Sequence, residues 1–403
     1  MTLKQKPSDQ YPSLSLNKGR DQSILRKHPW IFSGAIRSTS GKLHEGEIAE
    51  VFDYEGNYLA SGFVENGSIA AKIFTFERTV INIDFWVEKL SAAWVLRQKT
   101  GLTESEQTNA WRLVFAEGDG LPGLILDYYN GLVVFLAQSL GMYKARFDIV
   151  RALKICLKEK LTAVYDKSVF TKKQEGTQDQ HFLTETNAEN PVMIKENGYS
   201  FLVDFMYGQK TGFFLDQRDN RYLVGKYSKG KKVLNLFSYT GGFSVYALKN
   251  DASAVYSVDS SSTAIELAAK NVALNCPEIA DRHYGVIADV KDYLQQMESD
   301  FDLIILDPPA FAKHRESRHK AILGYKYLNS AAIKRIRKGG ILFTFSCSQL
   351  VTADLFESMI LSAGIESGRN VRVIHRLSQP ADHPFSIFHP EGNYLKGLVL
   401  YVE

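Results

Sequence analysis

Apolar and polar positions alternate in a regular order through the second half of the chain. Short apolar runs predict buried strands at 233–237, 254–258, 283–288, 302–306 and 341–346. Segments with apolar residues at helical spacing predict helices at 243–249, 262–274, 290–296, 320–337 and 353–362. Strands alternating with helices are typical of a parallel sheet with helices on both faces. Ligands of such sheets bind beyond the carboxyl ends of the strands, so we expect the functional site there.

The first half of the chain has a different pattern. Up to Phe76, β-like runs at 47–52, 57–63 and 69–74 are separated by glycine turns and predict a small β-barrel or sheet. A helix is predicted at 84–99, then a strand at 132–138 and a helix at 145–161. The polar segment 166–190 is predicted to be a loop or a frayed hairpin.

These patterns predict an α/β protein of three domains. We expect an N-terminal β module over residues 1–76, a small α+β middle domain over 77–190, and a Rossmann-like domain over 191–403.

The strand predicted at 233–237 ends in a glycine turn, Ser238-Tyr239-Thr240-Gly241-Gly242. Glycines at such a turn let backbone N–H groups approach a ligand closely at the positive end of the following helix. A glycine-rich turn alone indicates a nucleotide-like ligand only weakly.

Acidic residues end the next three predicted strands. Asp259 is placed to accept hydrogen bonds from ribose hydroxyls, or to cap the following helix. Asp289 could meet an adenine amino group, or serve as an N-cap. Asp307 begins Asp-Pro-Pro-Ala-Phe311, where two prolines hold the backbone rigid and remove two donors. A structural turn explains an acid before two prolines poorly.

The missing phosphate motifs narrow the choice of ligand. The chain has no G-x-x-x-x-G-K-[ST] loop, which argues against ATP or GTP hydrolysis, and no G-x-G-x-x-G dinucleotide fingerprint. An adenosine without a pyrophosphate remains, and S-adenosylmethionine (SAM) fits.

Cys347 follows the last predicted strand and should point toward the same crevice as Asp307. Sulfur is a good nucleophile, and nearby cations favour its thiolate. The alternative is a small buried hydrophobic residue, as expected for Cys156 and Cys276. The three cysteines show neither disulfide nor metal-ligand spacing, so we expect a reducing cytoplasm and no metal.

Positive charge is concentrated in two stretches of the chain. The 403-residue chain has a net charge of only +3, but residues 1–37 carry +5 and residues 313–338 carry +8. Aromatic residues such as Trp30 and Tyr325 are interleaved with these cations. Both stretches could contact an RNA backbone and stack on bases; alternatively they are solvated faces, with Trp30 in the core. Neither a membrane-length apolar run nor a signal peptide is visible.

Together these motifs resemble a family, the bacterial PUA-domain-containing SAM-dependent methyltransferases that act on cytosine C5 of large-subunit (23S) ribosomal RNA. Gly19-Arg20 with Arg26–Gly34 is similar to the PUA opening of this family, and Glu117–Leu124 to its middle-domain signature. The cofactor motifs match Gly208–Arg221 and Asn235–Phe243, and the catalytic motifs match Asp307–Phe311 and Ser346-Cys347-Ser348. The resemblance covers essentially the whole chain.

The resemblance implies a mechanism. Cys347 adds to cytosine C6, and Asp307 hydrogen-bonds N3 or the amino edge, so that C5 can take the methyl group. Better-known cytosine-5 RNA methyltransferases have a second cysteine after the proline of the Asp-Pro motif; here Pro309 occupies that place, and no residue is assigned to release. The expected partner is RNA, and a homodimer that presents RNA from one protomer to another is an open alternative.

Two other functions compete. One is an N-methyltransferase acting on an exocyclic amine, which would favour an aromatic residue where this chain has Ala310. The other is a non-catalytic RNA-binding or ribosome-assembly factor.

The candidate residues fall into three groups. Cys347 and Asp307 are the catalytic pair. The cofactor-binding candidates are Gln217, Arg218, Asn235, Phe237, Ser238, Tyr239, Thr240, Gly241, Asp259, Ser260, Asp289 and Asp307. The RNA-binding candidates are Arg20, Lys27, Trp30, Lys313, Arg315 and Arg318.

Overall fold

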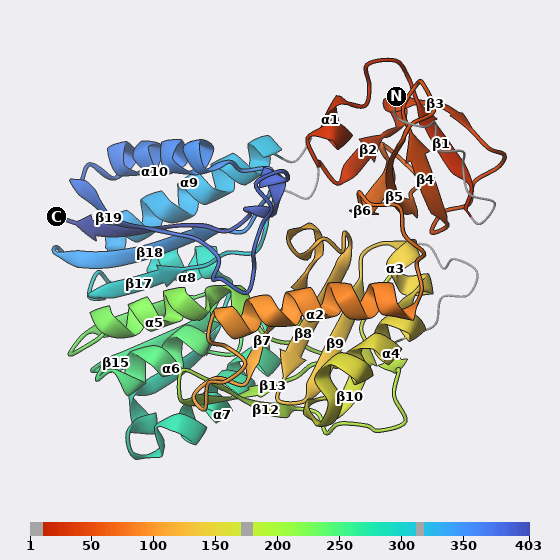
Figure 1. Ribbon diagram of the computed structural model, residues 1–403. Helices are drawn as coiled ribbons and strands as arrows, with labels where there is room; N and C mark the ends of the chain where they lie inside the picture. Colours follow the sequence, from red (N-terminus) through yellow and green to blue (C-terminus); the bar gives the residue numbers. More distant parts are fainter. Residues whose placement is uncertain (1–10, 171–179, 312–317) are drawn as a thin grey trace. The chain divides into compact units, whose positions relative to one another are not determined.

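The computed structural model describes residues 11–170, 180–311 and 318–403 and forms two compact units (Figure 1). The first unit comprises Met1–Val192, Asp204–Gly212 and Ala381–Gly392, and the second comprises Met193–Val203, Phe213–Pro380 and Asn393–Glu403. The domain limits at residues 76 and 190 stay a prediction.

The second unit is built on a seven-stranded sheet of order β16-β15-β14-β17-β18-β20-β19. The parallel strands are β14 (Lys232–Leu236), β15 (Ala254–Asp259), β16 (His283–Ile287), β17 (Leu303–Leu306) and β18 (Gly340–Ser346). All five were predicted to within about a residue. β14, β17 and β18 are buried apolar runs, whereas the edge strand β16 is largely exposed. The antiparallel pair β19 (Val371–Leu377) and β20 (Lys396–Val402) at one edge was not predicted.

Helices cover both faces of this sheet, which confirms the predicted architecture (Figure 1). One layer contains α5 (Arg218–Tyr227), α6 (Gly242–Lys249) and α7 (Ser262–Asn275); the other contains α8 (Val290–Gln296), α9 (Arg318–Arg335) and α10 (Ala353–Ser367). Side chains cap several N-termini: Ser261 accepts from the backbone N–H of Ala264, and Thr352 from that of Leu355. The central strands contribute fully buried residues such as Leu234, Ile304 and Leu342 to the core between sheet and helices.

A short hairpin, β12 (Val192–Glu196) and β13 (Tyr199–Val203), leads into the second unit. Asn271 and Asn275 on α7 accept hydrogen bonds from the backbone N–H groups of β13, at Leu202 and Ser200. A buried ion pair joins Glu196 to Arg221 of α5, which fixes the helix against the hairpin.

The first unit begins with a six-stranded sheet of order β2-β6-β5-β4-β1-β3. Its strands are β1 (Ser13–Leu16), β2 (Trp30–Phe32), β3 (Ile36–Thr39), β4 (Ile48–Phe52), β5 (Tyr58–Val64) and β6 (Ile69–Thr75), with the short helix α1 (Gln22–Leu25) after β1. The sheet encloses a small core of its own, which includes Leu16, Ile31 and Val51. The three predicted strand runs of this region are confirmed as β4, β5 and β6.

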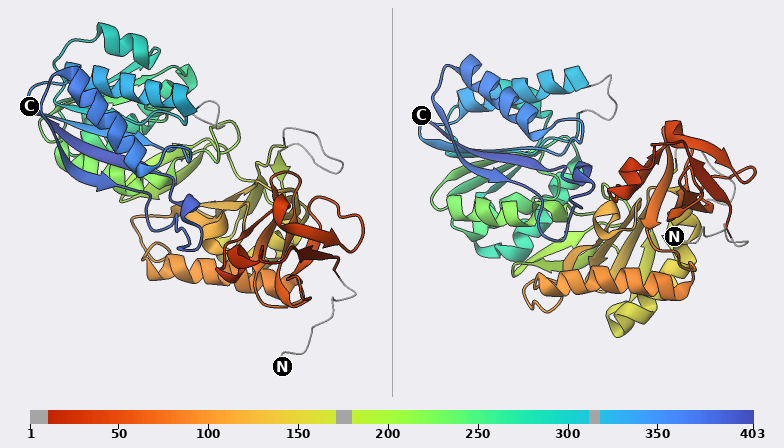
Figure 2. Two further views of the ribbon diagram at one scale, coloured as in Figure 1. Left: turned by 90° about the horizontal axis from the view of Figure 1, so that it is seen from above. Right: turned by 45° about the horizontal axis from the view of Figure 1, so that its top comes forward.

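The rest of the first unit is a five-stranded sheet of order β11-β10-β9-β8-β7 with helices packed on it. The strands are β7 (Ala110–Phe115), β8 (Leu124–Tyr129), β9 (Leu132–Ala137), β10 (Ala163–Asp166) and β11 (His181–Phe182). The helices are α2 (Ile83–Lys99), α3 (Leu140–Lys144) and α4 (Arg146–Leu157). The long helix α2 lies along this sheet (Figure 1 and Figure 2), and its Trp86 and Leu90 are buried in the shared core.

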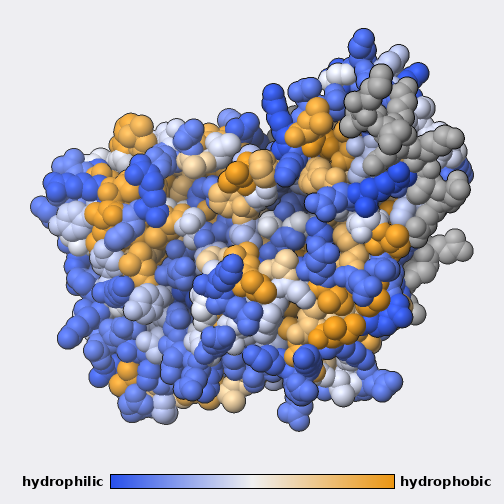
Figure 3. Space-filling model, in the orientation of Figure 1, coloured by the Kyte–Doolittle hydropathy of each residue, from blue (hydrophilic) through white to orange (hydrophobic). Residues whose placement is uncertain are grey.

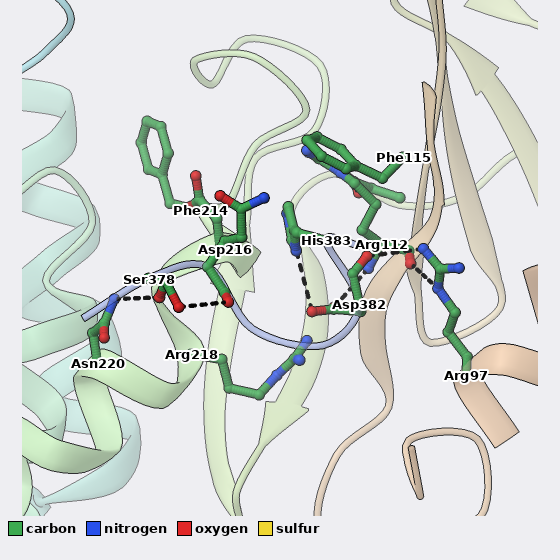
Figure 4. Close-up of polar contacts among 12 residues, drawn as sticks. Arg97, Arg112, Phe115, Phe214, Asp216, Arg218, Asn220, Ser378, Asp382 and His383 are labelled. Atoms are coloured by element: carbon green, nitrogen blue, oxygen red, sulfur yellow. Dashed lines mark hydrogen bonds and ion pairs between the residues drawn. The ribbon is translucent and has the colours of Figure 1, made fainter. Parts of the chain in front are cut away.

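A buried arginine organises the first unit. Arg97 on α2 is fully buried, makes a bidentate ion pair with Asp119, and donates to the backbone carbonyl of Asp382 at 2.9 Å (Figure 4). The backbone N–H of Arg112 donates to the Asp382 carboxylate at 3.0 Å. Residues 381–392 therefore fold with the first unit, although they lie between two strands of the second.

We expect Arg97→Met to destabilise the first unit by about 3–5 kcal/mol, because it leaves the buried Asp119 carboxylate without its cation. The matched control is Arg151→Met, which breaks the exposed pair with Asp148 and should cost less than about 1 kcal/mol. Urea unfolding of both variants measures the difference. Equal effects would contradict this account of the buried pair.

The surface drawn in Figure 3 is largely hydrophilic, with hydrophobic side chains gathered in several separate groups. In the described part of the chain, no helix combines the length and the apolar character needed to cross a membrane.

Candidate active site

The carboxyl ends of the five parallel strands lie along one edge of the seven-stranded sheet. β14 pairs with β15 on one side and β17 on the other, so the strand order reverses at β14. Ligands of open α/β sheets bind at such a point. The turn after β14 and the loops that follow β15, β17 and β18 thus all reach this edge.

The turn after β14 is unusually strained and closely packed. Phe237 and Tyr239 have positive φ angles of 57° and 46°, which bulky residues rarely adopt. Gly241 has a φ of 76°, and a Cβ there would lie 2.8 Å from the Ala268 Cβ. Backbone strain of this kind is concentrated at ligand sites, where it presents backbone groups to the ligand.

Asp259 fastens this turn to the end of β15. Its carboxylate accepts from the backbone N–H of Tyr239 at 2.9 Å and from that of Ser261 at 3.0 Å. A carboxylate can accept about four hydrogen bonds, so acceptor capacity remains for a ligand. Asp259 therefore has a structural role beside its predicted one, while the helix cap itself comes from Ser261.

Ser238 offers an unsatisfied hydroxyl at this turn. Its hydroxyl is buried at the turn and, within the described ranges, has no hydrogen-bond partner. A buried hydroxyl without a partner costs free energy, so a polar group of a bound molecule would satisfy it. The residues present therefore fit a cofactor with polar groups at this turn.

Other predicted cofactor residues have structural contacts. The Asn235 amide donates to Ser244 of α6 at 2.9 Å, and the Thr240 carbonyl accepts from Asn271. Asp289 caps α8 by accepting from the backbone N–H of Lys291 at 2.8 Å, as its alternative reading predicted. Ser260 is exposed beside Asp259.

Gln217 orients Asp307. Asp307 is half-buried directly after β17, and its Oδ2 accepts from Gln217 Nε2 at 3.0 Å. Asn220 Nδ2 in turn donates to Gln217 Oε1 at 2.6 Å and holds that amide in place. Figure 4 shows Asn220 beside Ser378, whose carbonyl also accepts from it. Gln217 was predicted to bind cofactor, whereas the structure places its amide against the predicted catalytic acid.

Arg218, the next residue and another predicted cofactor contact, is buried near Glu196.

Cys347 lies beside Asp307. Its sulfur is 4.0 Å from the carbonyl oxygen of Pro308, it is half-buried, and it is not in a disulfide. The two residues follow neighbouring parallel strands, since Leu306 pairs with Thr344. The structure thus brings the predicted catalytic pair together at the predicted edge.

Two further ionisable residues border this pair. Tyr325 on α9 is fully buried, and its pKa is raised by that burial and by the negative charges of Cys347 and Asp307. Lys396 at the start of β20 donates to the Ser348 carbonyl at 2.7 Å, and burial lowers its pKa to about 8. The prediction that Tyr325 could stack on RNA bases is wrong, because its side chain is fully buried, and Lys396 was not predicted to lie at the site. The sequence feature that could have pointed to Lys396 is its position as the first residue of an otherwise apolar run.

The predicted RNA-contacting residues have different environments. Arg20, Lys27 and Arg318 are exposed, whereas Lys313 and Arg315 lie outside the described residues. Trp30 is half-buried: its indole donates to Glu117 at 2.9 Å, and its ring lies 4.5 Å from that of His389. Part of the second basic stretch has structural partners, because Arg335 donates to the Met297 carbonyl.

His28, His389 and Glu391 are close enough to one another to be considered as metal ligands. However, the backbone N–H of Trp30 donates to His28 Nδ1 at 3.2 Å, so the neutral ring carries its proton on Nε2. That nitrogen faces Glu391 at 3.8 Å, and a protonated nitrogen cannot bind a metal. We assign no metal to this cluster.

We expect Asp259→Ala to weaken binding of S-adenosylhomocysteine by about 10- to 100-fold, because two backbone N–H groups of the turn lose their acceptor. Asp281→Ala, which removes an exposed carboxylate just before the amino end of β16, is the matched control and should change binding less. Calorimetric titration of both variants measures the effect. Equal affinities for Asp259→Ala and wild type would contradict this role of Asp259.

Two family models match the chain. Residues 14–76 match a PUA-like domain, and residues 170–386 match the S-adenosylmethionine-dependent methyltransferase family. The first match covers the six-stranded sheet, and the second covers the turn after β14 and both predicted catalytic residues. SAM is therefore the cofactor of this protein.

Full-length relatives agree with this assignment. A protein of Aeromonas salmonicida named ribosomal RNA large subunit methyltransferase I is 40% identical over 393 residues, covering 96% of this chain and 98% of that protein. A protein of Salmonella typhi with the same name is 40% identical over 400 residues, covering 98% of each chain.

Solved structures show the same fold. A candidate SAM-dependent methyltransferase from Streptococcus mutans superposes with a TM-score of 0.81 at 22% identity, covering 97% of this chain and all of that one. A candidate methyltransferase crystallised with SAH gives 0.83 at 23% identity with the same coverage. By its family matches and its full-length relatives, the chain belongs to the S-adenosylmethionine-dependent methyltransferases that carry an N-terminal PUA-like domain.

Proposed function

We propose that this protein methylates C5 of a cytosine in large-subunit ribosomal RNA through a covalent adduct between Cys347 and C6. The substrate class is supported by the full-length relatives, which are named ribosomal RNA large subunit methyltransferase I. One observation carries the chemistry: Cys347 and Asp307 meet at the ends of neighbouring strands, one strand away from the turn after β14.

The adduct is needed because C5 of cytosine is a weak nucleophile. The Cys347 thiolate adds to C6, while Asp307, held by Gln217, hydrogen-bonds N3 or the amino edge of the base. Electron density then rises at C5, which can take a methyl group; bound SAM supplies that group. A base removes the C5 proton, and the sulfur leaves as a thiolate.

We assign cofactor binding to the turn and the neighbouring loops. Ser238 offers its unsatisfied hydroxyl, and Phe237, Tyr239 and Gly241 present backbone groups at strained positions. Asp259 and Ser260 are assigned to the ribose side and Asp289 to the adenine side. Asn235, Thr240 and Arg218 are assigned to the support of this surface. Arg20, Lys27, Trp30 and the basic residues Lys313, Arg315 and Arg318 are proposed to contact RNA.

The exocyclic-amine alternative is less well supported. It needs an aromatic side chain that can stack on the target base after the two prolines. Phe311, one position late, packs instead on the ring of Tyr325 with centroids 4.8 Å apart and contributes to the core. A non-catalytic RNA-binding factor would not need the strained turn and would tolerate Asp259→Ala.

The direct test is transfer of a labelled methyl group from SAM to unmodified ribosomal RNA, followed by nucleoside identification. We expect the label in 5-methylcytidine of the large-subunit RNA. A label in an N-methylated base would overturn the C5 assignment, and transfer confined to small-subunit RNA would overturn the substrate.

A further inference from the structure

Lys396 lies directly across the sheet from the end of β18. In the antiparallel pairing of β18 with β20, Lys396 is the register partner of Ser346, the residue before Cys347. Its side chain is half-buried, and its ammonium donates to the carbonyl of Ser348, the residue after Cys347, at 2.7 Å. Lys396 therefore spans the backbone on both sides of the cysteine.

Lys396 has no carboxylate partner in the described part of the chain. Among the residues that the structure describes, none of the acidic side chains lies within ion-pair distance of Lys396. A carbonyl oxygen accepts a hydrogen bond from the ammonium but does not cancel its charge. The positive charge therefore remains available to a neighbouring anion.

Three ionisable groups from three elements face the cysteine. Asp307 comes from the loop after β17, Tyr325 from α9 and Lys396 from β20. Asp307 when ionised disfavours a second negative charge, and Tyr325 is neutral because its pKa is raised by burial. Of these three, only Lys396 carries a positive charge that can stabilise a thiolate.

We propose that Lys396 is a positioning residue that holds the sulfur of Cys347 as a thiolate, ready to add to the base and again when the sulfur leaves it. A cation within a few ångströms of a thiol shifts its ionisation by about 1–3 pH units. This inference rests on the proposed role of Cys347, and it names the group that prepares the nucleophile.

The pairing has a defined pH range. Burial lowers the pKa of Lys396 to about 8, and the nearby sulfur opposes this effect. Since the charged form of Lys396 predominates below that pKa, the stabilisation of the thiolate is largely present at neutral pH and is lost as the pH rises through about 8.

The test is the rate of alkylation by iodoacetamide as a function of pH, read at each cysteine by peptide mass spectrometry. Wild type is compared with Lys396→Met, which removes the charge, and Lys396→Arg, which keeps it. Cys156, half-buried and far along the chain in the other unit, serves as the internal control, and Cys276 is fully buried.

We expect Lys396→Met to raise the alkylation midpoint of Cys347 by at least about one pH unit, a tenfold loss of thiolate at neutral pH. Lys396→Arg should stay close to wild type, and the Cys156 midpoint should not move in any variant. If Lys396→Met exposes Cys276 to alkylation, and so fails to fold, Lys396→Gln replaces it. An unchanged Cys347 midpoint in a folded neutral variant overturns the inference.

Failure of this inference and failure of the proposed function give different results. If Cys347 forms an adduct with RNA but its alkylation midpoint is the same in wild type and Lys396→Met, the covalent mechanism stands without a role for Lys396. If the alkylation midpoint of Cys347 shifts in Lys396→Met, but the enzyme methylates RNA without forming an adduct, the interaction of Lys396 with Cys347 stands and the covalent mechanism is wrong.

Discussion

Cys347→Ala is expected to lower methyl transfer to RNA by at least roughly 10³-fold, because the base can then no longer be activated by addition at C6. Binding of S-adenosylhomocysteine should be unchanged, since Asp259 holds the turn after β14 by accepting from the backbone N–H of Tyr239. Single-turnover transfer of labelled methyl, with a binding titration alongside, separates the two effects.

The matched control is Cys156→Ala, which removes a half-buried cysteine that contacts Ser91 in the first unit. It should retain nearly full activity. On the exocyclic-amine alternative Cys347→Ala would stay active as well, because direct transfer to an amine needs no thiolate. Activity of Cys347→Ala within tenfold of wild type would thus contradict the covalent mechanism.

Asp307→Asn is expected to lower methyl transfer by about 10²- to 10⁴-fold, the usual range for loss of a positioned acid or base. An amide at this position can turn its NH₂ group toward the base edge or toward Gln217, but it cannot exchange a proton with the base. Asp307 is also a candidate cofactor residue, so transfer and cofactor affinity are measured together.

Asp281→Asn is the control for this substitution, because it neutralises an exposed carboxylate just before the amino end of β16 in the same sheet. A loss confined to Asp307→Asn, with cofactor affinity kept within about tenfold, supports the catalytic assignment. If Asp307→Asn lost cofactor binding but kept its transfer rate at saturating SAM, Asp307 would be a cofactor ligand only.

The parallel core of the second unit could be predicted because its central strands β14, β17 and β18 are buried on both faces and form apolar runs. β20 is also apolar but follows the long irregular segment 378–395, and it pairs antiparallel with a strand far away in sequence. Local periodicity contains no information about such a partner. For the same reason, nothing in the sequence indicated that residues 381–392 fold with the first unit.

In the candidate site, too, some residues could be predicted from local sequence and others could not. Asp259, Asp307 and Cys347 were found from sequence because parallel strands bring their carboxyl ends to one edge. The contacts of Gln217 with Asp307 and of Lys396 with the Cys347 backbone depend on packing between distant segments. Trp30 fits neither of its alternatives alone, since it is half-buried and yet bonded through its indole to Glu117.

The central claim is the bond between Cys347 and C6, and RNA containing 5-fluorocytosine tests it most directly. Fluorine at C5 blocks the proton-removal step, so methylated RNA should remain attached to the protein. We predict a denaturation-resistant complex whose crosslinked peptide contains Cys347, absent in Cys347→Ala. Confirmed methylation at C5 of unmodified RNA without any such complex would contradict the account.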